Sequence, residues 1–135
     1  MFQFLYTWFL RAAWAPIAVV LVQQIVARFY DIDWLMHFFG GAAMAFFFYQ
    51  GLLLWESSIG RLLPIVRHLL AFGLTCGVVI AWELTEFTSD RLFETRFQAS
   101  IPETMGDQLS GVIGAIFILG CIALFASCQN WERQR

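Results

Sequence analysis

The stretch IVRHLLAFGLTCGVVIAWELTEF, Ile65 to Phe87, decides how this chain folds. It is mainly apolar and long enough to cross a bilayer as a helix, which takes about 20 residues. Near its end it carries two glutamates three positions apart, Glu83 and Glu86, where a membrane-spanning helix normally has no charge. The stretch predicts a membrane helix and raises the question of what these glutamates do.

The composition of the whole chain fits the same environment. Of its 135 residues, 60% are hydrophobic, 18% are aromatic and 13% are charged, whereas about 25% of the residues in a soluble protein are charged. The formal net charge of -2 does not favour nucleic acid as a partner. Cys76, Cys121 and Cys128 lie inside apolar runs without the spacing of a metal site, so we expect small structural side chains.

Four stretches meet the requirements of a spanning helix, namely residues 12–27, 33–55, 65–87 and 108–128. The first has the least certain start, because the apolar residues 1–10 either extend it or lie along the membrane surface. Helices of this kind must pack side by side in lipid. The prediction is therefore an all-α fold, a single domain over residues 1–135 that forms a bundle of four transmembrane helices.

The arginines, which are the only basic residues, set the predicted orientation. Five lie on the side of the two termini and the second connection, namely Arg11, Arg61, Arg67, Arg133 and Arg135. Three lie in the first and third connections, namely Arg28, Arg91 and Arg96. The positive-inside rule then places both termini and the second connection in the cytoplasm.

Polar residues gather toward the opposite, outer face. Asp33 and His37 lie one turn apart on the second span, and Asp107 begins the fourth, which enters from the same side. Glu83 and Glu86 end the third span as it reaches that side. Because the helix dipole disfavours a carboxylate at a C-terminus, we expect both glutamates to face inward and share a site with the other three residues. The cytoplasmic half of the bundle offers almost no polar groups.

Two further patterns concern the starts of the second and fourth spans. Gly41 and Gly111 lie one turn deeper than the polar residues, and glycines allow close helix packing, so we expect these spans to meet there. The carboxylates at helix starts also have a purely structural interpretation as N-terminal caps. Ser100 followed by Glu103 fits a capping box.

One histidine among several carboxylates suits Mg, Mn or Ca better than structural zinc. The predicted metal ligands are Asp33, His37, Glu83, Glu86 and Asp107. Arg91 and Arg96 would meet an anionic lipid headgroup as substrate. A metal-activated water would make the protein a hydrolase, with Glu83, Glu86 and His37 as its catalytic residues.

The motifs DWLMHFFGG, WELTE and ETMGD followed by Gly114 resemble those of small multi-span bacterial membrane proteins of the VanZ-like and YjdF-like type. The resemblance covers roughly residues 33–115 and implies a protein of the cell envelope, in the bacterial inner membrane, associated with glycopeptide resistance in the VanZ-like branch. The positions it marks are Asp33, His37, Glu83, Glu86, Asp107 and Gly114. Glu103 and Gly111 depart from the residues expected in these patterns.

Two other functions compete with a metal and headgroup site. The acidic rim would also suit a non-catalytic subunit that docks another membrane protein. An ion or proton transporter fits less well, because transporter sites lie near the membrane midplane, whereas this cluster lies at one end. The sequence identifies neither a substrate nor a protein partner.

Overall fold

The computed structural model describes residues 2–26, 29, 32–98 and 100–132. These residues form α-helices and one short π-helical segment, with no strand among them. Four helical stretches are long and apolar enough to cross a membrane, namely Gln3–Val26, Asp33–Ile59, Pro64–Phe93 and Ile101–Gln129. The predicted all-α bundle of four membrane-spanning helices is confirmed.

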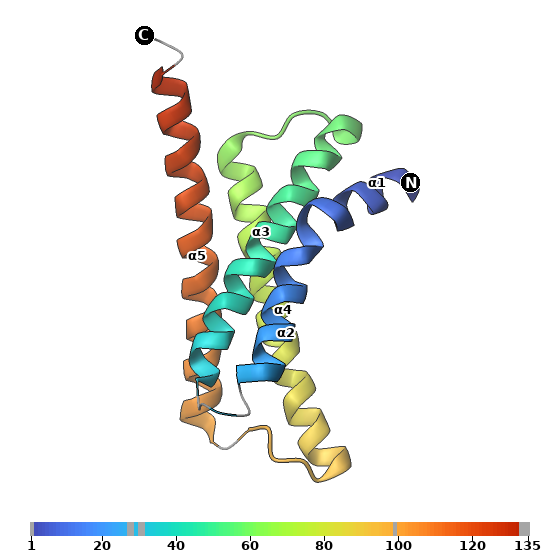
Figure 1. The fold of residues 1–135 in the computed structure, drawn as a ribbon, viewed down its shortest axis with the longest axis vertical. Helices are drawn as coiled ribbons and strands as arrows, with labels where there is room; N and C mark the ends of the chain where they lie inside the picture. The colour runs from blue at the N-terminus through green and yellow to red at the C-terminus, as the bar shows by residue number, and fades with distance from the viewer. Residues whose placement is uncertain (1, 27–28, 30–31, 99, 133–135) are drawn as a thin grey trace.

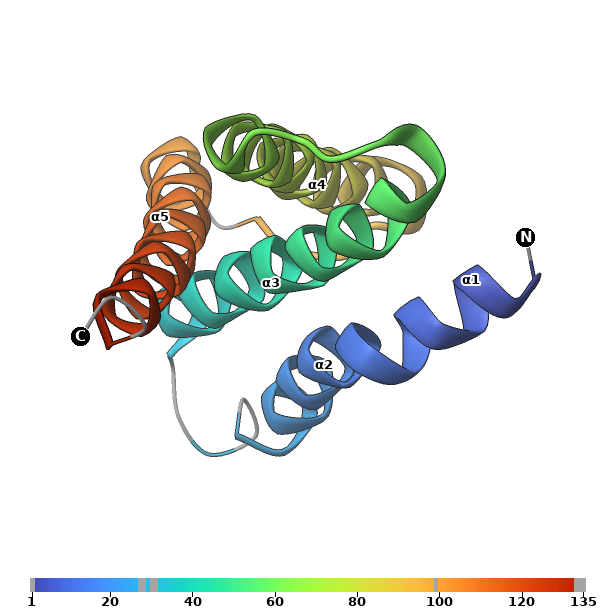
Figure 2. The same cartoon turned by 90° about the horizontal axis from the view of Figure 1, so that it is seen from above.

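The elements follow one another as α1 (Phe2–Trp8), η1 (Phe9–Ala13), α2 (Trp14–Val26), α3 (Asp33–Ile59), α4 (Pro64–Phe93) and α5 (Ile101–Glu132). Helix α3 is central, with α2, α4 and α5 arranged around it (Figure 2). Within the described residues, α2 and α4 both pack on α3 but not on each other. A space between α2 and α4 therefore has α3 as its back wall.

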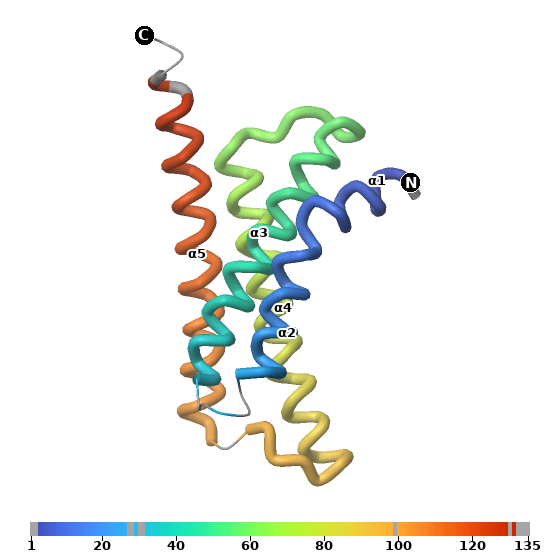
Figure 3. The backbone as a smooth tube through the Cα atoms, in the orientation of Figure 1, coloured from blue at the N-terminus to red at the C-terminus, as the bar shows by residue number. Residues whose placement is uncertain are grey.

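The two ends of the bundle differ in what they carry. One end holds the start of the first helix, the α3–α4 connection and the end of α5 (Figure 1). The smooth trace shows the α4–α5 connection at the other end, close to where α3 begins (Figure 3). We call this second end, formed by the first turns of α3 and α5 and the last turns of α4, the site end.

Helices α3 and α5 approach each other through glycines. A Cβ atom at Gly41 would overlap the backbone carbonyl of Gly111, and one at Gly114 would overlap the carbonyl oxygen of Phe38. Any larger residue at these positions would force the two helices apart, since backbone lies directly against backbone. The predicted role of Gly41 and Gly111 in packing the second span on the fourth is confirmed.

The first span is helical from Phe2 and bends at η1 (Figure 1). A π-helical turn is a recognised cause of such a bend. Trp8, just before it, donates a hydrogen bond from Nε1 to the Phe47 carbonyl at 2.8 Å and stacks on the Phe47 ring with centroids 4.6 Å apart. Gly51 leaves room for this indole, because a Cβ there would overlap the Trp8 ring. The residues before position 12 thus extend the first helix.

The end of the bundle opposite the site end holds a polar group that the sequence analysis missed. Arg67 Nε donates to Glu56 Oε1 at 2.7 Å, and Arg67 Nη1 donates to the Tyr49 hydroxyl at 3.2 Å. Both charged side chains are largely buried, at 13% and 12% exposed. A hydrogen bond to a charged group contributes about 1.5–3 kcal/mol, so this group ties α3 to α4. The expectation that this half lacks polar groups was wrong.

Helix α4 continues to Phe93, past the expected end of the third span at residue 87. Glu83 and Glu86 consequently lie about three and two turns before the helix end. The argument that placed them at a helix C-terminus was wrong. The α4–α5 connection is correspondingly short, and at its end the Glu103 amide donates to Ser100 Oγ at 3.3 Å, as the capping box predicts.

Four positions named in the predictions of spans and orientation lie outside the described residues. Arg28, Arg133 and Arg135, which enter the orientation argument, lie outside the described residues. So does residue 27, the expected end of the first span.

The glycine contact between α3 and α5 predicts different effects at two adjacent positions. Gly41→Ala should lower the melting temperature of the detergent-solubilised protein, because overpacking typically costs about 1–3 kcal/mol. Gly40→Ala is the matched control, since a Cβ at Gly40 meets nothing within 4 Å. Thermal unfolding followed by tryptophan fluorescence measures both. Equal melting temperatures for the two variants would contradict this account of the packing.

Candidate functional site

The first turns of α3 carry two groups of the site, Asp33 and His37. Asp33 lies in the first turn, where a carboxylate suits the helix dipole, and its side chain is 47% exposed. His37 lies one turn deeper and is only 10% exposed. Residues four apart share a helix face, which leaves His37 Nε2 3.8 Å from Asp33 Oδ1.

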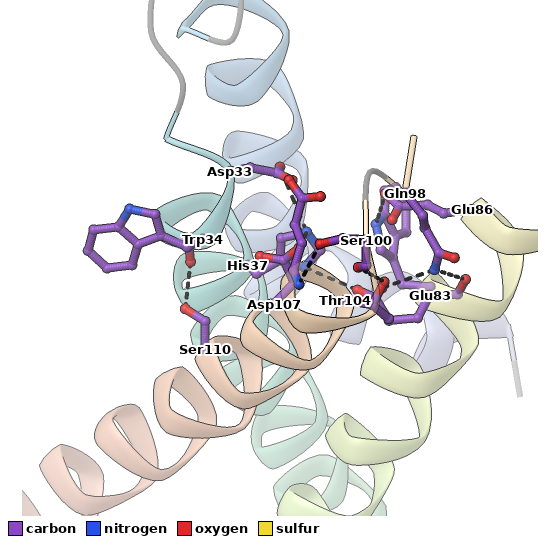
Figure 4. Close-up of polar contacts among 12 residues, drawn as sticks. Asp33, Trp34, His37, Glu83, Glu86, Gln98, Ser100, Thr104, Asp107 and Ser110 are labelled. Carbon is purple, nitrogen blue, oxygen red and sulfur yellow. Dashed lines mark hydrogen bonds and ion pairs between the residues drawn. The ribbon is translucent and has the colours of Figure 1, made fainter. Parts of the chain in front are cut away.

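Helix α5 adds Asp107 to this pair. His37 Nε2 lies 4.0 Å from Asp107 Oδ2, and Asp107 is buried. One ligand atom from each of Asp33, His37 and Asp107 lies within 4.8 Å of the other two. Figure 4 shows the three side chains pointing toward one another from α3 and α5. The close packing of these helices at Gly41 makes this approach possible.

Glu83 from α4 lies on the other side of the imidazole ring. Its Oε1 is 3.7 Å from His37 Nδ1, and the residue is 3% exposed. Both ring nitrogens of His37 thus face carboxylates. A metal-bound histidine uses one nitrogen for the metal and commonly directs the other to a carboxylate or carbonyl. The geometry divides the site in the same way, with Nε2 toward Asp33 and Asp107 and Nδ1 toward Glu83.

Gln98, in the α4–α5 connection, contacts Glu83 but was not predicted. Its Nε2 donates to the Glu83 carbonyl oxygen at 3.0 Å and lies 3.4 Å from Glu83 Oε2 (Figure 4). Among the described residues, Glu83 Oε1 is buried without a hydrogen-bond partner. A buried acceptor left in this state typically costs about 1–3 kcal/mol. Oε1 is therefore positioned to accept a proton or a hydrogen bond from His37 Nδ1.

Asp90 holds the connection that carries Gln98. Its Oδ1 accepts hydrogen bonds from Thr95 Oγ1 at 2.6 Å and from the Phe97 amide at 2.8 Å, and its Oδ2 accepts one from the Gln98 amide at 2.9 Å. Sequence reasoning missed both Asp90 and Gln98. The only signal was an acidic residue before a polar connection, which is too common to identify its partners.

Three predicted site residues lie apart from these contacts. Glu86 accepts a hydrogen bond from Trp82 Nε1 at 2.8 Å, and no ion pair joins it to His37 within the described part of the chain. Arg91 places its guanidinium 5.3 Å from the centre of the Phe87 ring. Arg96 is exposed in the α4–α5 connection. The structure thus brings together four of the predicted residues and leaves Glu86 and the two arginines outside.

We call the four grouped residues, Asp33, His37, Glu83 and Asp107, the acidic site. It contains three carboxylates and one imidazole, and no arginine of the described residues forms an ion pair with it. Like charges in a poorly hydrated environment repel one another strongly. Either protons or a bound cation must balance the acidic site.

Two cavities adjoin the acidic site, and both have residues of α3 in their walls. One, of about 550 Å³, lies between α3 and α5 and is lined by Asp33, Glu103 and Asp107 together with Trp34 and Ser110. The Ser110 hydroxyl donates to the Trp34 carbonyl across it (Figure 4). The other, of about 240 Å³, lies between α2, α3 and α4 and reaches His37. The site thus has access from the bundle end and from the membrane side.

With this geometry in view, comparison with known proteins shows one relationship. Residues 3–127 match DUF2238, a family described as predicted membrane proteins. The chain belongs to this family. No curated protein and no solved structure matches it. As a DUF2238 protein with four apolar helices of spanning length, the chain is an integral membrane protein whose helices lie in the lipid bilayer.

The contacts of Asp90 predict that this residue orders the α4–α5 connection. Asp90→Ala should accelerate amide hydrogen exchange at Phe97 and Gln98, because their N–H groups lose their acceptor. Ser89→Ala is the control, since the Ser89 hydroxyl donates only to the Thr85 carbonyl within α4. Exchange followed by mass spectrometry on the peptide that spans the connection measures both. An unchanged rate in Asp90→Ala would mean that the connection is held by other contacts.

Proposed function

We propose that the protein binds one divalent cation between Asp33, His37 and Asp107 at the outer face of the membrane. The observation that carries this proposal is the set of donor atoms that these residues place within 4.8 Å of one another. The carboxylate set, with a single nitrogen ligand, suits Mg, Mn or Ca. The absence of a balancing arginine among the described contacts of the site further favours a cation.

Within this proposal, Glu83 orients His37 and is not a ligand. Glu83 faces Nδ1 at 3.7 Å and is itself held by Gln98, while Nε2 faces the two aspartates. Residues that orient a ligand in this way typically change metal affinity by about 10–100-fold when they are mutated. Glu86, bonded to Trp82, lies outside the ligand set that we propose.

Three protein ligands leave coordination positions open on a cation that takes about six to eight. In the hydrolase form of the proposal, a water in such a position would be activated as a nucleophile, while His37 acts as a ligand of the cation and Glu83 orients it through Nδ1. A headgroup phosphate would bind there as well. Arg91 and Arg96 are exposed in and beside the α4–α5 connection, where they would contact an anionic headgroup.

We also propose that the chain is a YjdF-like or VanZ-like protein of the bacterial cell envelope. The resemblance marked the positions Asp33, His37, Glu83 and Asp107, and their grouping around one imidazole supports treating the three motifs as parts of one site. We place the chain in the inner membrane with both termini in the cytoplasm, which follows from the distribution of arginines.

The cation site predicts a graded response to mutation. Purified protein, stripped with chelator and dialysed against Mn²⁺, should hold one equivalent of metal. Asp107→Asn should abolish this binding, because it removes a charged ligand, and Glu83→Gln should weaken it by about 10–100-fold. Glu86→Gln is the matched control and should bind Mn²⁺ as the unmodified protein does. Elemental analysis and titration measure both the stoichiometry and the affinity.

Two results would decide against the cation. Unmodified protein without stoichiometric metal, accompanied by a stably co-purifying membrane protein, would favour the role of a non-catalytic partner subunit. An equal loss of Mn²⁺ binding in Glu86→Gln and Asp107→Asn would show that the metal binds to the negative charge of this end in general and not to the three proposed ligands.

The orientation gives a further prediction. A fluorescent protein fused to the C-terminus should fluoresce, and alkaline phosphatase fused there should be inactive, because we place the C-terminus in the cytoplasm. A fusion in the α4–α5 connection should give the reverse pattern. An active phosphatase at the C-terminus would move the acidic site to the cytoplasmic face.

A further inference from the structure

The cavity between α2, α3 and α4 has no role in the cation site. Of its twelve lining residues, only His37 and Gln23 carry strongly polar side chains, and the others are mainly aliphatic. The cavity exists because α2 and α4 pack on α3 without packing on each other. Val20 and Trp82, which line it from opposite sides, are 48% and 47% exposed. The cavity therefore opens sideways toward the bilayer.

The cavity runs along the helices, from the acidic site toward the middle of the membrane. On α3 its lining extends from Met36 to Met44, which corresponds to roughly 12 Å along the helix axis. On the antiparallel α2 it extends from Gln23 back to Pro16. Its length thus lies parallel to the chains of the surrounding lipids.

Gly40 lines this cavity without a side chain. A Cβ atom at Gly40 would meet nothing within 4 Å, although the residue lines the cavity. The neighbouring Gly41 differs, because its Cβ would overlap the backbone of Gly111. Gly40 is therefore not needed for the close packing of α3 on α5, and a side chain there would extend into the cavity that His37 also lines.

We propose that this cavity holds one hydrocarbon chain of a membrane lipid whose phosphate headgroup meets the cation at the acidic site. The inference rests on the proposed cation site and names the class of its ligand. His37 is the residue shared by both parts, since it lines the apolar cavity and faces the carboxylates. An amphipathic molecule matches this arrangement, with its chain on one side of His37 and its charged group on the other.

Size and surroundings favour a single chain over other occupants. At about 240 Å³, the cavity exceeds the roughly 150 Å³ of an apolar cavity that takes up benzene, but its volume is too small for a helix of about 10 Å diameter. Water is disfavoured, because an internal water needs two to four polar partners. A cavity open to the bilayer is exposed to lipid chains at very high local concentration.

The test uses the full chain in phosphatidylcholine nanodiscs with Mn²⁺. The probe is phosphatidic acid with a diazirine in one acyl chain, and the comparison probe is diacylglycerol with the same chain. After illumination, mass spectrometry maps the labelled residues. Phosphatidic acid should label Val20, Met44 and Val79 more than the lipid-facing Leu124 of α5, whereas diacylglycerol should label them without this preference. Chelation of Mn²⁺ should remove the preference for phosphatidic acid.

Two substitutions separate the chain cavity from the cation site. Gly40→Leu fills the cavity and should reduce labelling of Val79 to the level of Leu124, while Mn²⁺ binding is retained. Gly77→Leu is the matched control on α4, where a Cβ also meets nothing within 4 Å, and it should leave labelling unchanged. Val20→Trp narrows the cavity from α2 and should act like Gly40→Leu, which keeps the test valid if one variant folds poorly.

The outcomes distinguish this inference from the proposed function. Protein that binds Mn²⁺ but shows no preferential labelling of the cavity would overturn the lipid chain and leave the cation site intact. Preferential labelling that persists in protein without any bound metal would support the chain cavity and contradict the cation site. Equal labelling of Gly40→Leu and unmodified protein would show that the chain lies elsewhere.

Discussion

The backbone contact of α3 with α5 at Gly41 and Gly111 is the interaction on which the acidic site depends. Lipid chains are as apolar as the helix surfaces, so helices in a membrane gain little from hydrophobic burial and associate through close packing and polar contacts. Glycine provides this packing here, because no side chain intervenes between Gly41 and the Gly111 carbonyl. The contact lies one turn below His37 and Asp107, and it brings them to 4.0 Å.

The sequence predicted those parts of the structure that follow from periodicity within a helix. Hydropathy identified four spans, and the spacing of Asp33 and His37 placed them on one face without any knowledge of the fold. Asp107 needed one more step, namely that the second and fourth spans enter from the same side and pack through glycine. These inferences depend mainly on hydropathy and on residue spacing within one helix, which do not require the arrangement of the helices to be known.

The end of α4 could not be predicted in the same way. Polar residues follow position 87, where the sequence predicts the end of the third span, yet Thr88 and Ser89 donate their hydroxyls to carbonyls four residues earlier and stay within the helix. The helix ends only where Glu94 adopts a left-handed conformation with φ of 54°. The inward position of Glu83 therefore comes from packing on α3 rather than from a helix terminus. Gln98 was missed because the path of a connection is not encoded in hydropathy.

The Arg67–Glu56 pair and the acidic site differ in whether their charged groups have a partner of opposite charge. At one end, Arg67 meets Glu56 and the pair is neutral without any external ion. At the site end, three carboxylates surround His37, although Arg91 lies about two turns beyond Glu83 on the same helix. Arg91 instead extends over the Phe87 ring. Within the described residues, the acidic site thus lacks an arginine partner because Arg91 extends elsewhere, and not because arginines are absent from this end.

The acidic site lies beside two cavities of different character. His37 lines the mainly aliphatic cavity that is open to lipid, and it also faces Asp33 and Asp107, which line the other cavity. A ligand with a charged head and an apolar chain would use both spaces at once. Gly40 lines the aliphatic cavity and is not required for the packing of α3 on α5, so a side chain at this position would compete with the apolar chain of such a ligand.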